Sequence, residues 1–250
     1  MSDERKVLLE VKNLSVEFNG FKAFTEVNMK IYDGELRVII GPNGAGKTTF
    51  MDLVTGKTTP TSGSVIFDGQ NITGKSVTEI ARNYRIGRKF QGPNVFDNMT
   101  VKENIEIAAE GYNSLTGCVF FRKTKAFKEK VNEILKLIDL YEYRHFFASD
   151  LSHGQRQWLE IGMVVAQNPK LIILDEPTAG MTADETYKTG EMIKRLKGEH
   201  TLIVVEHDMD FVRQVAEYVT VLNYGKLLAE GTMEEVQNNE EVIAVYLKED

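Results

Sequence analysis

The sequence GPNGAGKTT at residues 41–49 decides the fold of this chain, because it fills every fixed position of the phosphate-binding loop pattern G-x-x-x-x-G-K-[ST]. The apolar segment 35–40 before it is typical of a strand, and residues 50–54 after it carry the apolar face of a helix. Glycines let the backbone wrap around phosphates, and amide N–H groups at the start of a helix point at an anion. The pattern therefore predicts a loop that binds a nucleoside triphosphate.

Two residues of the loop have distinct chemical roles. Lys47 is expected to neutralise charge on the β- and γ-phosphates, and the Thr48 hydroxyl is expected to ligate Mg²⁺. The alternative, a glycine-rich turn with a chance Lys-Thr pair, is disfavoured because the whole pattern lies between a strand and a helix. The residues predicted to bind the nucleotide here are Gly41, Pro42, Asn43, Gly44, Ala45, Gly46, Lys47, Thr48 and Thr49.

The composition is that of one large globular domain, since 250 residues with 42% hydrophobic and 27% charged residues can bury a substantial core. No uncharged apolar run has membrane-spanning length, and the first residues lack the pattern of a secretory signal. The single cysteine, Cys118, cannot form an internal disulfide, which suits a reducing cytosol. A net charge of −7 disfavours general nucleic-acid binding, which needs a basic face.

Periodicity divides the chain into a β-rich lobe, a helical insertion and an α/β core. Residues 7–11, 15–18 and 24–31 are typical of strands, whereas residues 92–155 carry apolar positions at helical spacing. The strand, helix and strand expected after the insertion are residues 171–176, 187–196 and 201–205. This alternation predicts an α/β fold with a mainly parallel sheet.

Polar residues near strand ends supply the other groups that γ-phosphate hydrolysis needs. Asp175 ends an apolar strand and is placed to support Mg²⁺, and Glu176 beside it is a candidate general base. His207 follows a second apolar strand, at the sheet edge where ligands bind in open α/β folds. Gln91 is a further candidate to supply an oxygen to the metal or to the attacking water. Each of these signals is weak alone and gains weight from the phosphate loop upstream.

A further motif, LSHGQ at 151–155, has no role that local chemistry explains, but it completes a set that resembles the ATP-binding cassette (ABC) ATPases over nearly the whole chain. The motifs that carry this resemblance are the loop 41–49, Gln91, residues 151–155, the strand 171–176 and His207. In that family the 151–155 segment opens a helix and contacts the γ-phosphate of ATP held by the other subunit. The resemblance therefore implies that Ser152, Gly154 and Gln155 bind ATP across a dimer interface, assisted by the helix dipole.

The same resemblance implies the fold and its division. We expect an α/β phosphate-loop cassette with a mainly parallel core sheet, an antiparallel β lobe and a helical subdomain. The single domain 1–250 would comprise a core at about 1–91 and 156–250 and a helical signature subdomain at about 92–155. Phe18 would stack on adenine, with Phe21 as the second candidate and a buried core position as the alternative for Phe18.

Partners and location follow from the family as well. Apolar Val95, Phe96 and Met99 are expected to line the groove that receives a short coupling helix of a transmembrane permease. The resemblance also implies a second ATPase subunit, identical or paralogous, and an extracytoplasmic solute-binding protein, with no nucleic acid. The chain would lie in the cytoplasm, peripherally on the inner face of the plasma membrane.

Two residues depart from the common family pattern. His153 stands where the signature usually has glycine, and it adds a group that can change charge near neutral pH close to a phosphate-facing loop. Thr182 stands where many members have aspartate, so it cannot provide a carboxylate to the other subunit. The segments GRKFQ, LSHGQRQWLEIG, AGMT and VEHDM at 87–91, 151–162, 179–182 and 205–209 are similar to the branched-chain amino acid importer group, and within it most to bacterial urea importers.

The expected function is therefore ATP hydrolysis that powers uptake of a small polar solute, with urea as the first expectation and a branched-chain or other amino acid as the alternative. A different class, a non-transport ABC ATPase acting on ribosomes or nucleic acid, is disfavoured by the single cassette, the lack of a long coiled-coil insertion and the net acidity. A phosphotransferase would leave residues 151–155 without a role.

Overall fold

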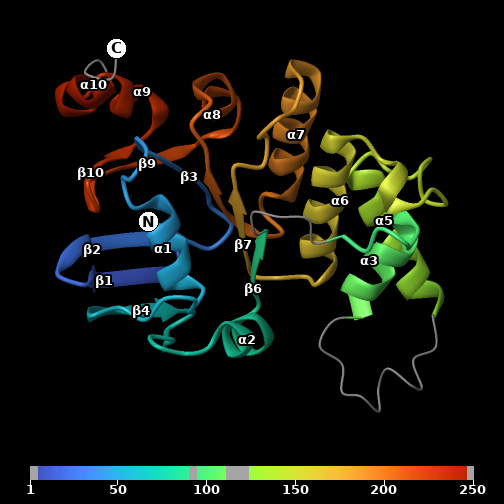
Figure 1. Ribbon diagram of the computed structural model, residues 1–250, viewed down its shortest axis with the longest axis horizontal. Helices are drawn as coiled ribbons and strands as arrows, with labels where there is room; N and C mark the ends of the chain where they lie inside the picture. The colour runs from blue at the N-terminus through green and yellow to red at the C-terminus, as the bar shows by residue number, and fades with distance from the viewer. Residues whose placement is uncertain (1–4, 90–94, 111–123, 247–250) are drawn as a thin grey trace.

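The structure, a computed structural model, describes residues 5–89, 95–110 and 124–246 and contains two sheets (Figure 1). The larger sheet has the strand order β10-β9-β3-β8-β7-β6, parallel from β9 to β6 with β10 antiparallel at one edge. Its strands are β3 (Leu36–Ile40), β6 (Ile86–Lys89), β7 (Leu171–Asp175), β8 (Thr201–Val205), β9 (Tyr218–Asn223) and β10 (Lys226–Gly231). Every residue of β3, β7 and β8 is buried, as expected of parallel strands covered on both faces.

The smaller sheet is antiparallel, in the order β2-β1-β4-β5. Its strands are β1 (Val7–Phe18), β2 (Phe21–Tyr32), β4 (Ser62–Phe67) and β5 (Gln70–Asn71). The two strands predicted at 7–11 and 15–18 are in fact one, so that prediction is wrong. An irregularity in pairing between Val11 and Leu14 lets β1 continue through the polar pair Lys12-Asn13. Asn13 has φ of 45° there, and its backbone N–H donates to Asn28 Oδ1 on β2.

Helices cover the sheets and form a separate group at one end, where Figure 1 shows α3, α5 and α6 side by side. The helical elements are α1 (Lys47–Val54), α2 (Val77–Glu79), η1 (Ile80–Tyr84), α3 (Val101–Glu110), α5 (Lys125–Leu137), η2 (Ala148–Asp150), α6 (His153–Ala166), α7 (Ala183–Leu196), α8 (Met209–Val215), α9 (Met233–Gln237) and α10 (Glu240–Tyr246). The helix expected from Tyr187 begins earlier, at Ala183, because Thr182 and Glu185 form a capping box. None of the helices in the described ranges combines the length and apolar character needed to cross a membrane.

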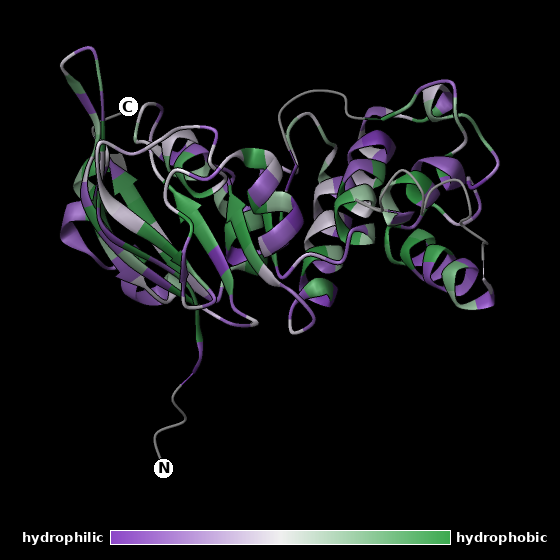
Figure 2. Cartoon of the chain, turned by 90° about the horizontal axis from the view of Figure 1, so that it is seen from below, coloured by the Kyte–Doolittle hydropathy of each residue, from purple (hydrophilic) through white to green (hydrophobic). Residues whose placement is uncertain are grey.

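Two apolar cores lie on opposite faces of the larger sheet. On β3, Val38 belongs to the core shared with α3, α5, α6 and α7, whereas Ile39 belongs to the core shared with α1 and the antiparallel sheet. The same alternation occurs on β7, as the two-residue period of a strand requires. Figure 2 shows these strands as mainly hydrophobic. The sheet therefore separates the helix that follows the phosphate loop from the helix that follows residues 151–152.

Candidate active site

The phosphate loop joins the end of β3 to the start of α1, and its path depends on glycine. Gly44 and Gly46 have φ of 77° and 101°, in the left-handed region that other residues rarely adopt. A side chain at Gly41 would place its Cβ 2.2 Å from the carbonyl oxygen of Leu222 on β9. The glycines of the sequence pattern thus lie where the backbone turns sharply or approaches another strand.

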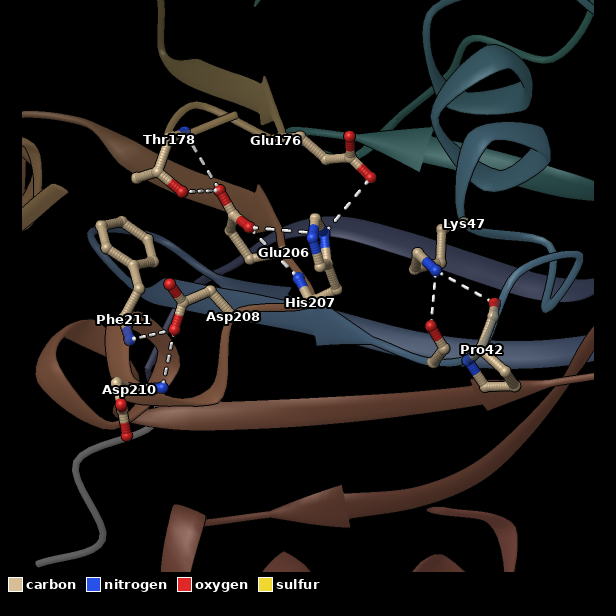
Figure 3. Close-up of polar contacts among 10 residues, drawn as sticks. Pro42, Lys47, Glu176, Thr178, Glu206, His207, Asp208, Asp210 and Phe211 are labelled. Carbon is tan, nitrogen blue, oxygen red and sulfur yellow. Dashed lines mark hydrogen bonds and ion pairs between the residues drawn. The ribbon is translucent and has the colours of Figure 1, made fainter. Parts of the chain in front are cut away.

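Lys47 is the first residue of α1, and its ammonium group lies over the loop. Its Nζ donates hydrogen bonds to the carbonyl oxygens of Gly41 at 2.5 Å and Pro42 at 3.0 Å (Figure 3). The N-cap residue Gly46 provides no side-chain cap, and the first turn of α1 contains no acidic residue. The Thr48 side chain next to it is exposed. The start of α1 thus presents amide donors, a cation and a hydroxyl, a combination that suits a phosphate.

Asp175 ends β7 and is nearly inaccessible, with 3% of its surface exposed. Burial raises the pKa of its carboxyl group, and Arg88, whose Nη2 lies 3.5 Å from Asp175 Oδ2, acts against that rise. The described residues contain no group of three or more His, Cys, Asp or Glu side chains that could hold a metal ion. Mg²⁺ in nucleotide sites takes few carboxylates and binds substrate phosphates as well, so Asp175 with the Thr48 hydroxyl fits this ion.

Glu176 and His207 meet because β7 and β8 are adjacent and parallel. Glu176 has φ of 45°, a conformation that in non-glycine residues is often found at active sites. Its backbone N–H donates to the Val205 carbonyl at 2.9 Å. The side chain of His207 is 67% exposed, and its Nδ1 lies 3.6 Å from Glu176 Oε1 (Figure 3). Glu176, the candidate general base, and His207, the second candidate at this sheet edge, are therefore neighbours in one chain.

Glu206 is a site residue to which the sequence analysis assigned no role. Its side chain is 1% exposed and accepts hydrogen bonds from the Thr178 backbone N–H at 3.1 Å and hydroxyl at 2.7 Å. The same carboxylate accepts the backbone N–H of His207 at 3.2 Å (Figure 3). It thereby joins the turn after Glu176 to the turn that carries His207. An acidic residue directly after an apolar strand was the available sequence signal.

The aromatic candidates for adenine stacking lie at the turn between β1 and β2. Phe18 and Phe21 pair across this turn and are 47% and 71% exposed, so Phe18 is not a core residue. The turn between β9 and β10 ties β2 to the phosphate loop. Thr25 N–H donates to the Gly225 carbonyl at 2.8 Å, and Gly225 N–H donates to the Ala45 carbonyl at 2.9 Å. Both rings are thus accessible on a hairpin anchored to the loop.

The 151–155 segment opens α6, as the family resemblance implied. Ser152 is its N-cap and forms a capping box with Gln155, in which the Ser152 hydroxyl accepts Gln155 N–H and Gln155 Oε1 accepts Ser152 N–H. Gly154 packs so tightly that a Cβ there would lie 2.4 Å from Glu185 Oε1 on α7. Because α1 and α6 belong to the cores on opposite faces of the sheet, a single chain does not bring this segment to its own phosphate loop.

The two departures from the family pattern lie close to each other. His153 Nε2 is 3.0 Å from the Ala179 carbonyl oxygen, and Gly180 lies against the imidazole ring, where a Cβ would be 3.1 Å from Nε2. Thr182 caps α7, because its hydroxyl accepts the backbone N–H of Glu185 at 3.3 Å. Thr182 therefore keeps the capping function that an aspartate also performs, without the negative charge.

Gln91 and Cys118 lie outside the described residues. Of the three apolar residues expected to line a groove, Phe96 does so, in a groove of about 300 Å³ between η1 and α6. Met163 of α6 and Gln167, which follows the end of α6, line the same groove. Val95 is half-buried and packs against the helical core, and it is not among the residues that line this groove. Met99 is half-buried and its carbonyl accepts the backbone N–H of Ala148, away from this lining.

A phosphate loop at one strand end, with Asp175, Glu176 and His207 at the ends of two neighbouring strands, defines a phosphate-loop ATPase. The family described as "ABC transporter" matches residues 24–179, and the family described as "Branched-chain amino acid ATP-binding cassette transporter" matches residues 226–247. The chain therefore belongs to the ATP-binding cassette transporter family and is an ATPase.

Curated relatives and solved structures agree with this assignment. The chain is 35% identical over 251 residues to the high-affinity branched-chain amino acid transport ATP-binding protein BraF of Pseudomonas aeruginosa, covering 97% of this chain and 98% of BraF. It is 36% identical to LivG of Escherichia coli over 252 residues, with 97% and 98% covered.

A solved ABC cassette in its ADP conformation has a TM-score of 0.84 at 32% identity, with 96% of this chain and 98% of that chain covered. The dimeric post-hydrolysis structure of another cassette, bound to ADP and phosphate, has a TM-score of 0.75 at 27% identity, with 90% and 99% covered. The predicted fold, an α/β cassette with a mainly parallel sheet, an antiparallel lobe and a helical region, is confirmed.

Proposed function

We propose that this chain is the ATP-hydrolysing subunit of an importer. The contact between Glu176 and His207 at the open end of β7 and β8, facing a loop built for phosphate, is the observation that carries this proposal. Glu176 accepts a proton from the attacking water, and His207 contacts the γ-phosphate. Lys47 moves from the loop carbonyls to the phosphate oxygens, and the start of α1 supplies amide donors. Gln91 is proposed to supply a side-chain oxygen to the metal ion or to the attacking water.

Asp175 and the Thr48 hydroxyl would hold Mg²⁺, the ion that fits this donor set. When bound, Mg²⁺ neutralises charge on the phosphate oxygens. Arg88 beside Asp175 favours the ionised carboxylate that a cation requires, against the effect of burial. The Glu206 carboxylate accepts hydrogen bonds from the Thr178 hydroxyl and from the His207 backbone N–H. It thereby holds together the two turns that carry Glu176 and His207.

The complete site needs two chains. Ser152, Gly154 and Gln155 begin a helix on the opposite face of the sheet from α1, so they serve an ATP molecule bound by another subunit. The helix start contributes its positive dipole end to that partner's γ-phosphate. The dimeric form of a related cassette supports this arrangement. The partner is either a second copy of this chain or a paralogue.

The groove lined by Phe96 and α6 is the proposed docking site for a permease segment. An amphipathic helix fits such a groove, with apolar side chains against Phe96 and Met163. Docking there would place the subunit in the cytoplasm on the inner face of the membrane, and an extracytoplasmic solute-binding protein would complete the transporter.

The proposed solute is a branched-chain amino acid. The relatives BraF and LivG are named for branched-chain amino acid transport, and the same solute class describes the family that matches residues 226–247. These names favour a branched-chain amino acid, which was the alternative solute expected from the sequence, over urea, which was the first expectation. No residue of this chain would contact the solute, which other subunits select.

A binding measurement on the partner system tests the solute. The extracytoplasmic binding protein of this transporter, to be sought among the neighbouring genes, should bind leucine, isoleucine or valine in calorimetry. The purified transporter should hydrolyse ATP faster when that loaded protein is added. Binding of urea and not of these amino acids would restore the urea expectation. Lack of any membrane partner, together with co-purifying nucleic acid, would contradict the importer function itself.

Replacing Phe18 by alanine is expected to weaken ATP binding by roughly 1–3 kcal/mol, the usual contribution of one stacked base. That loss corresponds to an increase in Kd of about 5- to 150-fold. Phe21→Ala is the matched control, since it removes an exposed aromatic from the same hairpin. Titration with a fluorescent ATP analogue measures both variants. A larger effect of Phe21→Ala would transfer the stacking role to Phe21.

A further inference from the structure

The edge strand β6 carries two adjacent buried cations, Arg88 and Lys89, whose side chains point to opposite faces of the sheet. β6 is the last strand of the order β10-β9-β3-β8-β7-β6, and both cations line the groove that also contains Phe96. The side chain of Arg88 is 4% exposed and that of Lys89 is 5% exposed. Buried cations need partners, and these two have different ones.

Arg88 joins the phosphate-loop helix to the candidate metal ligand. Its Nη1 lies 2.5 Å from Asp52 Oδ1 on α1, and its Nη2 lies 3.5 Å from Asp175 Oδ2 at the end of β7. The planar guanidinium can hold two carboxylates in a fixed geometry, which a lysine ammonium cannot do. A movement of β6 would therefore displace the group that orients Asp175.

Lys89 joins the same strand to the helix that begins at residues 152–155. Its Nζ lies 3.4 Å from Glu160 Oε2, and Glu160 lies on α6. Gly87, on the same face of β6 as Lys89, fits against α6 so closely that a Cβ would lie 2.8 Å from Val164 Cγ1. At Gly87 the strand and the helix are in direct contact, so a shift of β6 along this face would press on α6 at Val164.

We propose that β6 is the coupling strand of this subunit, in which Arg88 positions Asp175 for Mg²⁺ and Lys89 positions α6 for the partner's ATP, so that a permease segment in the groove acts on both. This inference rests on the proposed function, since the groove is the docking site proposed there. Arg88 and Lys89 are positioning residues, because neither is placed to touch ATP. If the two buried ion pairs only fill space in the interior, replacing Arg88 and replacing Lys89 should have no separate effects on the site.

The contacts of Arg88 and those of Lys89 predict separate binding defects. Both are measured in the isolated subunit that also carries Glu176→Gln, so that bound ATP is not hydrolysed. In Arg88→Met, the Mg²⁺ concentration for half-maximal enhancement of ATP binding should rise about tenfold, as for other residues that orient metal ligands. ATP binding with Mg²⁺ chelated should not change. Lys89→Met should keep the parental Mg²⁺ dependence but weaken ATP-driven dimerisation several-fold, which Arg88→Met at saturating Mg²⁺ should not. Identical profiles for the two variants would overturn the proposal.

Two further variants keep the test sharp. Arg88→Lys retains the positive charge and should therefore fold. A lysine cannot contact Asp52 and Asp175 at the same time, as the guanidinium does, so this variant should still raise the Mg²⁺ concentration that ATP binding requires. Lys57→Met is the matched control, because the Nζ of exposed Lys57 lies 3.3 Å from Asp52 Oδ2. This substitution removes a cation from beside Asp52 and leaves the contact between Arg88 and Asp175 in place. A Mg²⁺ shift in Lys57→Met equal to that of Arg88→Lys would overturn the specific role of Arg88. Circular dichroism and thermal unfolding establish that each variant folds.

The assembled transporter tests the coupling itself. At saturating Mg²⁺ and ATP, loaded binding protein should stimulate parental hydrolysis, and the stimulation ratio should fall severalfold in Arg88→Lys and Lys89→Met but not in Lys57→Met. A parental subunit that neither joins a permease nor responds to it would contradict the proposed function. A normal parental response with unchanged ratios in both variants would overturn only the coupling strand.

Discussion

Glu176→Gln is expected to abolish turnover while ATP binding persists and the subunits remain trapped as a dimer. The amide has the size of the carboxylate but cannot accept a proton, so the rate should fall by about 10²- to 10⁴-fold, the usual contribution of a general base. Glu176 is suited to this role because its side chain is 35% exposed at a strand end beside His207, whereas Asp175 before it is buried. Phosphate release measures turnover, and light scattering with Mg-ATP and with Mg-ADP measures the dimer.

The control for this variant is Glu142→Gln, which makes the same chemical change at a side chain that is 87% exposed and distant in sequence from every motif. Glu142→Gln should hydrolyse ATP at the parental rate and show no stable dimer. A parental rate in Glu176→Gln would remove Glu176 from the mechanism. A variant that loses turnover without forming an ATP-dependent dimer would instead contradict the two-chain site, because binding alone would then not hold the subunits together.

Local sequence patterns predicted the loop 41–49 and the strand and helix on either side of it, because the interactions that form them are local. The loop 41–49 lies between a strand and a helix whose apolar residues identify them, and its glycines occur where φ is positive or another strand is close. The strand ending at Asp175 and the strand before His207 were predicted for the same reason. Their meeting follows from the parallel pairing of β7 and β8, which the α/β alternation implied.

What the sequence could not show are contacts between residues far apart in the chain. Glu206 binds Thr178, Arg88 binds Asp52 and Asp175, and Lys89 binds Glu160. The position of Glu206 after an apolar strand marks that residue but not its partner. The other pairs have no spacing that marks them, since a buried charge and a solvated charge look alike in sequence. Val95 was assigned to a groove on its apolar character alone, and tertiary packing places it, half-buried, against the helical core.

Lys47→Ala is expected to weaken ATP binding itself, in contrast to the loss of turnover alone in Glu176→Gln. A hydrogen bond to a charged group contributes about 1.5–3 kcal/mol, so Kd should rise by roughly 10- to 100-fold. In this structure Lys47 Nζ already donates to the Gly41 and Pro42 carbonyls, and a triphosphate offers it negatively charged acceptors in their place. Lys47→Ala has no ammonium group that could bind the phosphate oxygens, whereas the glycines that define the path of the loop are unchanged.

Thermal unfolding with and without Mg-ATP measures this loss without relying on activity. At a concentration of 100 times the parental Kd, ATP should stabilise the parent by about 2.7 kcal/mol, and a variant with a 100-fold higher Kd should gain only about 0.4 kcal/mol. Lys12→Ala is the control, because Lys12 is 52% exposed on β1 and pairs with Glu10. Equal stabilisation of Lys47→Ala and the parent would show that this lysine does not bind the phosphates. Because a trapped dimer requires bound ATP, combining Lys47→Ala with Glu176→Gln should also abolish the dimer that Glu176→Gln forms alone.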